Sequence, residues 1–600
     1  MIATYRKLLD LLTARERRQF YWLIVMIVIM GVLQMMSIAL ILPLMFVLRR
    51  PDVIDTNTTL SWFYQTFGFQ SHQGFMIGLA AAVFFFIIFG MVFKAVASYA
   101  TYRFTMMRAY TISLRMLNAY LAQPYAWFLT RNSAGLGSAV LGEVQKVVTT
   151  SLLPAMRFIT SVVLSVSLIT LLIVIRPGVA MVAAGLIGGI YGLLYMSVRR
   201  KAVRMGRERH QMNELRYRVV GEAFGGMKDV KLLNLESYFS ARFRHPAERV
   251  AYCDAVNLIQ REVPRYVIEG VAFGGLLVFV LYLLISGDGD LASVVPILSV
   301  YAFTAIRLFP ALQQVYGSIG QMRFAQPTLD KLHDDFLATN AKSPQRLDAG
   351  SSAAPVRLTS SLELRDVVYA YPNAERAALR GFSITVEAHS SVGLVGGTGA
   401  GKTTAVDIML GLLEPQAGAL VIDGVAITPA TLPGWQRSIG YVPQHIFLTD
   451  DTIAANIAFG QKAKDIDMAA VERAARIAEL HDFVLRELPE GYQTKVGERG
   501  VRLSGGQRQR IGIARALYHD PDVLILDEAT SALDNLTEKA VMDAVHNLGR
   551  AKTIVMIAHR LTTVRDCDTI YMLEQGQVVA AGSYDELIET NRQFRALAGA

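Results

Sequence analysis

Residues 391–404 read SVGLVGGTGAGKTT and form the most informative stretch of the chain. The first five residues have the apolar pattern of a short buried strand, and they lead into a glycine-rich loop, Lys402-Thr403 and an apolar helix. Glycines let the backbone curl so that its N–H groups and the helix N-terminus face phosphates. Lys402 can then reach the β- and γ-phosphate oxygens, and the Thr403 hydroxyl is placed for Mg²⁺. The complete spacing predicts a P-loop rather than a tight turn.

Two further stretches of the C-terminal half fit the same chemistry. A second apolar strand at 523–526 ends in Asp527 and Glu528. Such a pair can divide the work of hydrolysis, because one carboxylate helps to hold Mg²⁺ and the next orients an attacking water. Residues 503–507, LSGGQ, open a helical stretch and predict another backbone site for an anion such as a γ-phosphate.

The chain as a whole is too apolar to be soluble. Of its 600 residues 52% are hydrophobic and 18% charged, and the mean hydropathy is +0.34, which would leave a soluble protein with too little polar surface. Six apolar segments are each long enough to cross a bilayer. They lie at 20–48, 75–102, 152–175, 179–198, 266–285 and 291–315.

The distribution of Lys and Arg predicts the orientation of these spans. The links after the second and fourth spans are long and basic, whereas the links after the first, third and fifth are short or poor in Lys and Arg. The positive-inside rule therefore places both termini in the cytosol. The net charge of +9 is typical of such loops, so we expect no nucleic-acid partner. The expected domains are an N-terminal cytoplasmic elbow segment at 1–19, a transmembrane domain with six helices and two long cytoplasmic loops at 20–335, a linker at 336–361 and a nucleotide-binding domain at 362–600.

LSGGQ resembles the signature motif of ATP-binding cassette (ABC) transporters, and the other motifs of that family follow in the right order. Tyr371 resembles the aromatic residue that stacks on adenine, and Gln444 resembles the Q-loop glutamine that senses Mg²⁺ and γ-phosphate. Asp534 resembles the D-loop aspartate and His559 the switch histidine. The resemblance implies an ATPase with Glu528 and His559 as catalytic residues, and Mg²⁺ bound by Thr403, Gln444 and Asp527. The ATP-binding residues that it implies are Tyr371, Gly396, Gly397, Thr398, Gly399, Ala400, Gly401, Lys402, Thr403, Thr404, Gln444, Ser504, Gly505, Gly506, Gln507 and Asp534.

Six spans ahead of one cassette resemble a half-transporter of the exporter type, and residues 496–500, VGERG, resemble the x-loop of that type. In this family ATP lies between the P-loop of one cassette and the signature of another, so two copies are required. We therefore expect a homodimer with two composite ATP sites in the bacterial cytoplasmic (inner) membrane, with the cassettes in the cytosol. The resemblance also implies coupling helices near 123–128 and 225–231. The expected fold class is an α-helical transmembrane domain followed by an α/β P-loop domain.

Ionisable residues within the spans point to the substrate, because a charge at mid-bilayer is costly. They are Lys94, Arg157, Arg265, Glu269 and Arg307. One interpretation is snorkelling to inner headgroups together with an Arg265–Glu269 pair at i, i+4. The other is a cationic patch that binds a phosphate or pyrophosphate head. Pro264-Arg265 and residues 307–310, RLFP, resemble the pyrophosphate-binding positions of bacterial lipid-linked oligosaccharide flippases, with Lys94 in place of a third arginine. The predicted substrate residues are therefore Lys94, Arg265 and Arg307.

The link between the first two spans contains one amphipathic stretch. Within 58–69, Leu60, Phe63, Tyr64 and Phe67 follow helical spacing. This stretch resembles the external helix of the same flippases, and a helix that merely caps the spans is an equal alternative. The expected function is ATP-driven movement of an anionic amphiphile from the inner to the outer leaflet, with a lipid-linked pyrophosphate oligosaccharide as first expectation. Alternatives are a lipid A precursor, a glycolipid or a hydrophobic drug, or an ATP-gated channel or regulator.

Overall fold

The computed structural model describes the chain except residues 1, 176, 287–290, 341–353, 373, 498–499, 529–534, 550, 559 and 599–600, and it leaves out some side chains elsewhere. The predicted D-loop Asp534 and switch His559 lie outside the described residues, as does part of the predicted x-loop. The chain forms two compact units. Unit 1 comprises Met1–Leu121 with Arg131–Ser343, and unit 2 comprises Ala122–Thr130 with Pro344–Ala600.

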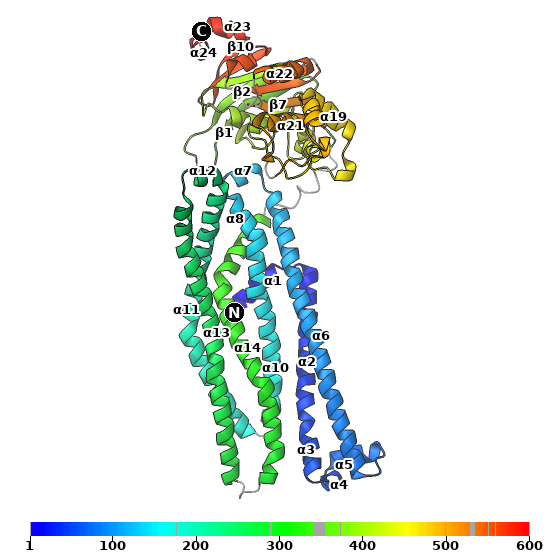
Figure 1. Cartoon of the computed structure of the whole chain (residues 1–600). Coiled ribbons are helices and arrows are strands. Elements are labelled where there is room, and N and C mark those ends of the chain that lie inside the picture. The colour runs from blue at the N-terminus through cyan, green and yellow to red at the C-terminus, as the bar shows by residue number, and fades with distance from the viewer. Residues whose placement is uncertain are drawn as a thin grey trace. The chain divides into compact units, whose positions relative to one another are not determined.

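Unit 1 is a bundle of long helices (Figure 1). Helix α2 packs against α6 and α10, α10 packs against α14, and α11 packs against α13 and α14. The first predicted span falls on α2 and α3 and each of the others on one long helix, so the predicted helical transmembrane domain is confirmed. The helices are α1 (Ile2–Asp10), α2 (Ala14–Ala39), α3 (Ile41–Arg49), α6 (His72–Leu121), α10 (Leu153–Ile175), α11 (Pro177–Gly225), α13 (Glu236–Ser286) and α14 (Leu291–Asn340).

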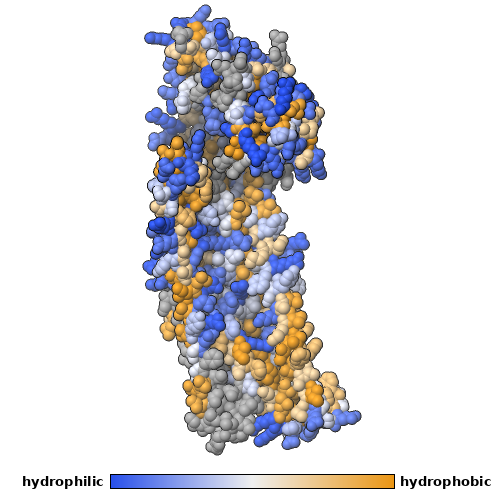
Figure 2. Space-filling view, viewed as in Figure 1, coloured by the Kyte–Doolittle hydropathy of each residue, from blue (hydrophilic) through white to orange (hydrophobic). Residues whose placement is uncertain are grey.

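The surface of the bundle suits lipid. Among the described residues, three helical stretches are long and apolar enough to cross a membrane, namely Ala14–Arg49, His72–Leu121 and Gly135–Ile175. Figure 2 shows apolar side chains gathered over the blue-to-light-blue helices of Figure 1. Phe84 and Phe85 on α6 are 67% and 64% exposed, an arrangement that is stable where hydrocarbon replaces water.

Short elements connect the long helices. The predicted external stretch, 58–69, forms α5 (Thr58–Thr66), which follows the short helix α4 (Val53–Thr56). Its expected single apolar face is divided: Leu60 and Tyr64 pack with a core cluster formed with α3 and α6, whereas Phe63 and Phe67 are exposed and stacked on each other. The third span extends backward through α8 (Ser133–Ser138), η1 (Ala139–Glu143), α9 (Val144–Val147) and η2 (Val148–Leu152), of which η1 and η2 are π-helical turns. Short helices occur at both expected coupling positions, α7 (Tyr125–Leu129) and α12 (Met227–Leu232).

Unit 2 is an α/β domain built on two sheets. The larger sheet has the strand order β10-β9-β3-β8-β7-β6, and β3, β6, β7, β8 and β9 are parallel. These strands are β3 (Ser391–Gly396), β6 (Ile439–Val442), β7 (Val523–Asp527), β8 (Thr553–Ile557), β9 (Thr569–Glu574) and β10 (Gln577–Gly582). The smaller, antiparallel sheet contains β1 (Ser361–Tyr369), β2 (Leu379–Glu387), β4 (Ala417–Ile422) and β5 (Val425–Ala426). Strands β3, β7 and β8 are almost wholly buried, as expected for a parallel sheet with both faces covered.

Helices complete unit 2. Helix α16 (Lys402–Met409) follows β3, and α21 (Gly505–Leu517) packs against α18 (Ile453–Ile457) and α19 (Met468–Ile477). Ala126 of α7 packs against the same apolar core as Tyr371 and Tyr441, so this expected coupling helix is an integral part of unit 2. The other helices are α17 (Leu432–Gln436), α20 (His481–Glu487), α22 (Asn535–Gly549), α23 (Tyr584–Thr590) and α24 (Arg592–Ala598), with 3₁₀ turns η3 (Ala463–Asp465), η4 (Gly491–Gln493) and η6 (Leu561–Val564).

Candidate functional site

The predicted P-loop lies at the carboxyl end of β3, where open α/β sheets bind ligands. Gly396 and Gly401 have φ angles of 150° and 103°. A Cβ atom at Gly396 would lie 2.3 Å from the carbonyl oxygen of Leu573, and one at Gly401 would lie 2.9 Å from that of Ala378. Glycine is therefore required at both positions by backbone conformation and by space.

Lys402 is folded over this loop. Its Nζ donates to the carbonyl oxygens of Gly396 at 2.7 Å and Gly397 at 3.1 Å. Burial lowers the pKa of Lys402, while the nearby Glu528 and Asp527 carboxylates raise it. The ammonium group thus contacts the loop and is influenced by the two acidic residues, at a site where the γ-phosphate of a nucleotide would need a positive charge.

The two carboxylates occupy the end of β7. Asp527 is 6% exposed and lies beside Tyr441, whose pKa is raised by burial and by the negative charge of Asp527. Glu528 adopts a φ of 49°, and its N–H donates to the Ile557 carbonyl oxygen at 3.2 Å. Because the backbone turns in the left-handed region at Glu528, the two side chains point in different directions. The Asp527 carboxylate is buried and that of Glu528 is partly exposed.

The structure brings the predicted Q-loop to Glu528. Gln444 Nε2 donates to Glu528 Oε2 at 2.8 Å, although the two residues are 84 positions apart. The bond holds the carboxylate in one orientation and leaves Gln444 Oε1 as an acceptor. Gln444 thus orients Glu528, and Glu528 is the residue expected to orient the attacking water, so this contact fits the predicted hydrolytic site.

Tyr371 and Thr404 are held together rather than projecting separately. Their hydroxyl oxygens lie 3.0 Å apart, and Thr404 is 5% exposed. The Tyr371 ring packs edge-on against Tyr369 with 5.2 Å between centroids, and burial raises the pKa of Tyr371. Thr404 therefore supports the tyrosine predicted to stack on adenine.

Sequence reasoning missed Asp407 in the helix that follows the P-loop. Asp407 lies on the buried face of α16, and burial, together with the Asp527 charge, raises its pKa to about 6. An acidic residue within the apolar run AVDIM was the available signal. Asp407 adds to the negative potential around Asp527.

The signature residues form the N-terminus of α21. Ser504 is the N-cap, and its Oγ accepts a hydrogen bond from the Gln507 N–H at 3.2 Å. Gln507 Oε1 accepts one in return from the Ser504 N–H at 2.8 Å. This capping box fixes the first turn, in which Gly505 and Gly506 keep backbone N–H groups accessible.

The three predicted substrate residues have different environments. Arg307 is half-buried, and its Nη1 donates to Gln34 Oε1 at 2.5 Å and to Ser37 Oγ at 2.9 Å. Arg265 is exposed and pairs with Glu269 at 2.7 Å, so the i, i+4 ion pair allowed by the spacing is present. Lys94 is exposed on α6. Of the three, Arg307 alone is enclosed by other helices of the bundle.

A second cationic group was only partly anticipated. Arg157 Nη2 donates to the Tyr102 hydroxyl at 3.2 Å, and its guanidinium lies 5.5 Å from the centre of that ring. Arg261 is half-buried, and its Nε has no hydrogen-bond partner among the described residues. Burial lowers the pKa of Arg261; Glu262 raises it and the neighbouring Arg157 charge lowers it further. Arg261 was missed because it lies further before the predicted fifth span, 266–285, than Arg265 does.

Comparisons with known proteins agree with this geometry. The ABC transporter transmembrane region family matches residues 56–251, and the ABC transporter family matches residues 379–531. The chain is also similar to bacterial proteins named ATP-dependent lipid A-core flippase. The one from Ralstonia nicotianae is 34% identical over 491 residues, which cover 81% of each chain. The one from Cupriavidus pinatubonensis is 33% identical over 489 residues, which also cover 81% of each chain.

The fold is also found among solved structures. A bacterial Atm1-family ABC exporter with ATP bound matches with a TM-score of 0.75 at 22% identity, over 97% of this chain and 98% of that one. The predicted family, fold class and ATPase activity are thereby confirmed, and a half-transporter of this fold acts as a dimer. The chain belongs to the ABC transporters, as an exporter half-transporter whose ATPase drives transport across a membrane.

Proposed function

We propose that two copies of this chain form a flippase in the bacterial inner membrane, with the cassettes in the cytosol, and move a phosphorylated lipid A precursor from the inner to the outer leaflet. The observation that carries the substrate class is the environment of Arg307. Its partners Gln34 and Ser37 are neutral and almost fully buried. A cation within a bundle is costly unless an anion offsets it, and a lipid phosphate would supply that anion.

Arg157 and Arg261 form a second cationic group that would also bind phosphate. Two neighbouring guanidinium groups repel each other, and Arg261 keeps an unpartnered buried Nε among the described residues. Arginine presents a planar fork that binds two phosphate oxygens at once. A ligand with more than one phosphate would therefore relieve the repulsion, whereas a neutral drug would not.

Two phosphorylated lipids fit these groups. The names of the similar flippases support a lipid A precursor over the lipid-linked oligosaccharide that was the first expectation. The oligosaccharide remains the second candidate, because residues 307–310, RLFP, resemble the pyrophosphate-binding positions of flippases for such lipids. Arg265 gives it less support, since Glu269 already neutralises that side chain.

The residues of the cassette suit ATP with Mg²⁺. Thr403 has an exposed side chain, Gln444 retains an oxygen acceptor, and Asp527 supplies a carboxylate, so the donors are the hard oxygens that Mg²⁺ prefers. Mg²⁺, when bound, would neutralise part of the phosphate charge. Lys402 would bind the γ-phosphate, and Glu528, held by Gln444, would orient the attacking water. The other predicted catalytic residue, His559, remains part of this proposal.

Exposed apolar side chains favour a homodimer. Tyr110 and Leu121, on α6 beyond the predicted second span, are 61% and 60% exposed, and Leu232 of α12 is 73% exposed. Such residues in water mark an interaction surface. With one signature and one P-loop in each chain, a second copy would complete both ATP sites.

Binding of a fluorescent lipid A precursor to the purified, detergent-solubilised full chain tests the substrate proposal. Arg157→Gln and Arg261→Gln should each weaken binding about tenfold, and the dephosphorylated lipid should bind the wild type equally poorly. Arg18→Gln, at an exposed site before the first span, is the control. Equal affinity for the phosphorylated and dephosphorylated lipids would reject the proposed headgroup site.

A further inference from the structure

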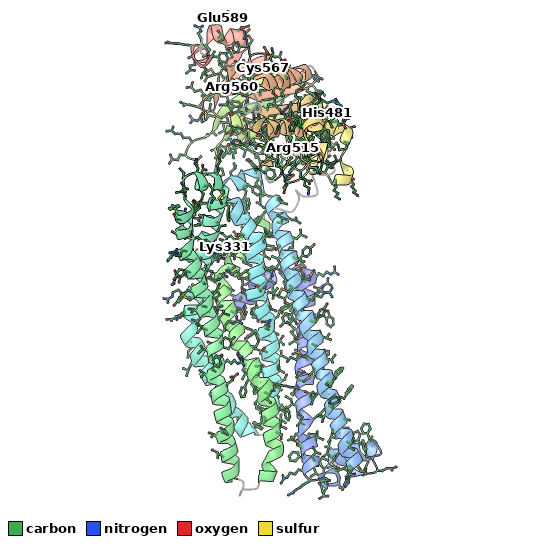
Figure 3. All side chains as sticks on the ribbon, viewed as in Figure 1. Lys331, His481, Arg515, Arg560, Cys567 and Glu589 are labelled. Atoms are coloured by element: carbon green, nitrogen blue, oxygen red, sulfur yellow. The ribbon has the colours of Figure 1, made fainter. Side chains whose placement is uncertain are left out.

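Arg515 lies in the last turn of α21 (Figure 3). It binds the segment 447–456, which contains none of the predicted ATP-binding residues. Its Nε donates to the Asn456 carbonyl oxygen at 2.8 Å, its Nη1 to the Phe447 carbonyl oxygen at 2.9 Å and its Nη2 to Asn456 Oδ1 at 3.3 Å. The guanidinium also lies 4.6 Å from the centre of the Phe459 ring. Five donors in a rigid fork make arginine suited to several acceptors at once.

Arg515 keeps its charge although it has no acidic partner among the described residues. Burial lowers the pKa of Arg515 to about 10, and no carboxylate contributes to that shift. The guanidinium therefore remains charged at neutral pH, and its bonds to neutral oxygens are charge-assisted. Such bonds are strong enough to fix the position of the segment they contact.

Asn456 passes this constraint along the segment. It is 0% exposed; its Oδ1 accepts from the Thr449 N–H at 3.0 Å and the Thr449 hydroxyl at 3.2 Å, and its Nδ2 donates to the Thr449 and Thr452 carbonyl oxygens, both at 3.0 Å. Hydrogen bonds within residues 447–456, and from Arg515 to Phe447 and Asn456, thus hold this segment in one conformation. Phe447, which Arg515 contacts, is three positions after Gln444.

The same segment reaches the stretch before the signature. Thr452 pairs with Lys495 in an isolated antiparallel bridge. The Ile453 N–H donates to the Thr494 carbonyl oxygen, and the Val496 N–H donates to the Asp451 carbonyl oxygen, both at 3.1 Å. Hydrogen bonds therefore join three parts of the cassette: the segment 447–456 that follows Gln444, the start of the predicted x-loop, and α21.

We propose that Arg515 is a positioning residue for ATP hydrolysis, which ties the segment after Gln444 to the signature helix so that Gln444 and Ser504 move together. The proposal rests on the predicted roles of Gln444 and Ser504 at the ATP site. Arg515 touches neither residue. It acts because α21 is a single helix with Ser504 at one end and Arg515 near the other, so a shift of the Gln444 segment displaces the signature loop.

The test compares ATP turnover with ATP binding in the full-length transporter in proteoliposomes. Arg515→Lys keeps the charge and removes the fork. It should lower kcat about tenfold, because small misplacements of reacting groups cost that much or more, while the Kd for ATP stays within about twofold. Arg510→Lys is the matched control: Arg510 lies on the same helix and donates to the Glu479 carbonyl oxygen at 2.6 Å, away from the Gln444 segment. It should change kcat less than twofold.

A second substitution shows whether Arg515 acts through Gln444. Gln444→Ala alone measures the predicted role of Gln444. If the inference holds, the double variant Gln444→Ala/Arg515→Lys is no slower than the slower single variant. The inference would be overturned if the double variant lost kcat by the product of the two single-variant factors. It would also be overturned if the Arg515 and Arg510 variants lost kcat equally. No lipid is measured, so the outcome is independent of the proposed substrate.

Folding failure of Arg515→Lys would not end the test. Thr449→Val removes only the hydroxyl bond to Asn456, and it should lower kcat roughly two- to fivefold at unchanged ATP affinity. Wild-type kcat in a folded Thr449→Val transporter would overturn the inference.

Discussion

Glu528 is the residue whose geometry bears most directly on catalysis. Its carboxylate accepts a hydrogen bond from Gln444 at 2.8 Å and follows the buried Asp527 in a left-handed turn. Glu528→Gln should retain ATP binding and lower phosphate release by a factor of about 10²–10⁴, because the side chain keeps its shape but no longer acts as a base. Glu414→Gln, at an exposed site, is the control. Wild-type phosphate release by the Glu528 variant would exclude this residue from catalysis.

Arg307 is the residue that links the bundle to the cargo. It bonds to Gln34 and Ser37, and Gln34 Nε2 donates in turn to the Gly90 carbonyl oxygen at 2.8 Å. Arg307→Ala should reduce the amount of lipid moved per ATP hydrolysed at least about tenfold, because a phosphate loses its charged partner. Parallel assays of transport and phosphate release give this ratio. An equal loss of both activities would mean that Arg307 is structural.

Asp423 gives the cassette a pH dependence. Burial would raise its pKa, but hydrogen bonds from Thr359, Ser360 and Ser361 outweigh this and lower the pKa. A lowered carboxyl pKa contributes stability above the unfolded pKa of about 4, and that stability is lost as pH falls through the folded value. Because Asp423 is largely open to solvent, Asp423→Asn should cost only about 0.5–1 kcal/mol of unfolding free energy at pH 7.

Thermal unfolding of the purified full chain, followed across pH 7 to pH 3, tests this prediction. The gap between wild type and Asp423→Asn should narrow below about pH 4, where the wild-type carboxylate takes up its proton. A gap that stays constant over this range would show that the charge of Asp423 contributes nothing.

At the scale of elements, the P-loop depends on the backbone of Gly401. A Cβ there would approach the Ala378 carbonyl oxygen at 2.9 Å, and the φ of 103° is strained for any other residue. Gly401→Ala should therefore lower the unfolding free energy by about 1–3 kcal/mol even without nucleotide. Gly397→Ala is the matched control, because a Cβ at Gly397 meets no atom within 4 Å. Similar melting of both variants would contradict the strain argument.

Elements with strong local patterns were predictable from sequence. The apolar run at 391–395, followed by glycines and Lys402, defined β3, the P-loop and α16, since strand pattern, turn chemistry and helix start agree. The six apolar runs likewise fall on long helices. The π-helical turns η1 and η2 were missed because one extra residue in a turn leaves no mark in a hydrophobic pattern.

Contacts between distant segments were less predictable. The motifs identified Gln444 and Glu528 separately, but only the fold shows that one holds the other. The spacing offered an ion pair between Arg265 and Glu269 as one interpretation, and the structure contains it. Sequence could not separate the half-buried Arg307 from the exposed Lys94, because burial depends on the neighbouring helices.

At the scale of the whole molecule, one chain combines a confirmed ATPase with a membrane unit whose cargo is proposed. A membrane unit that encloses Arg307 and a cassette with a complete P-loop are both present in one chain. The exposed apolar residues of α6 and α12 and the single set of nucleotide motifs favour two copies as the working unit. Hydrolysis and lipid movement should therefore depend on each other in the assembled transporter.

The most direct test is ATP-dependent flipping of fluorescent lipids in proteoliposomes, with wild type, Glu528→Gln and Arg307→Ala compared side by side. We predict that wild type flips a phosphorylated lipid A precursor faster than a pyrophosphate-linked oligosaccharide lipid, and that neither variant flips the lipid A precursor efficiently. Wild-type protein that hydrolyses ATP but flips neither phosphorylated lipid would contradict the proposed cargo while leaving the ATPase intact.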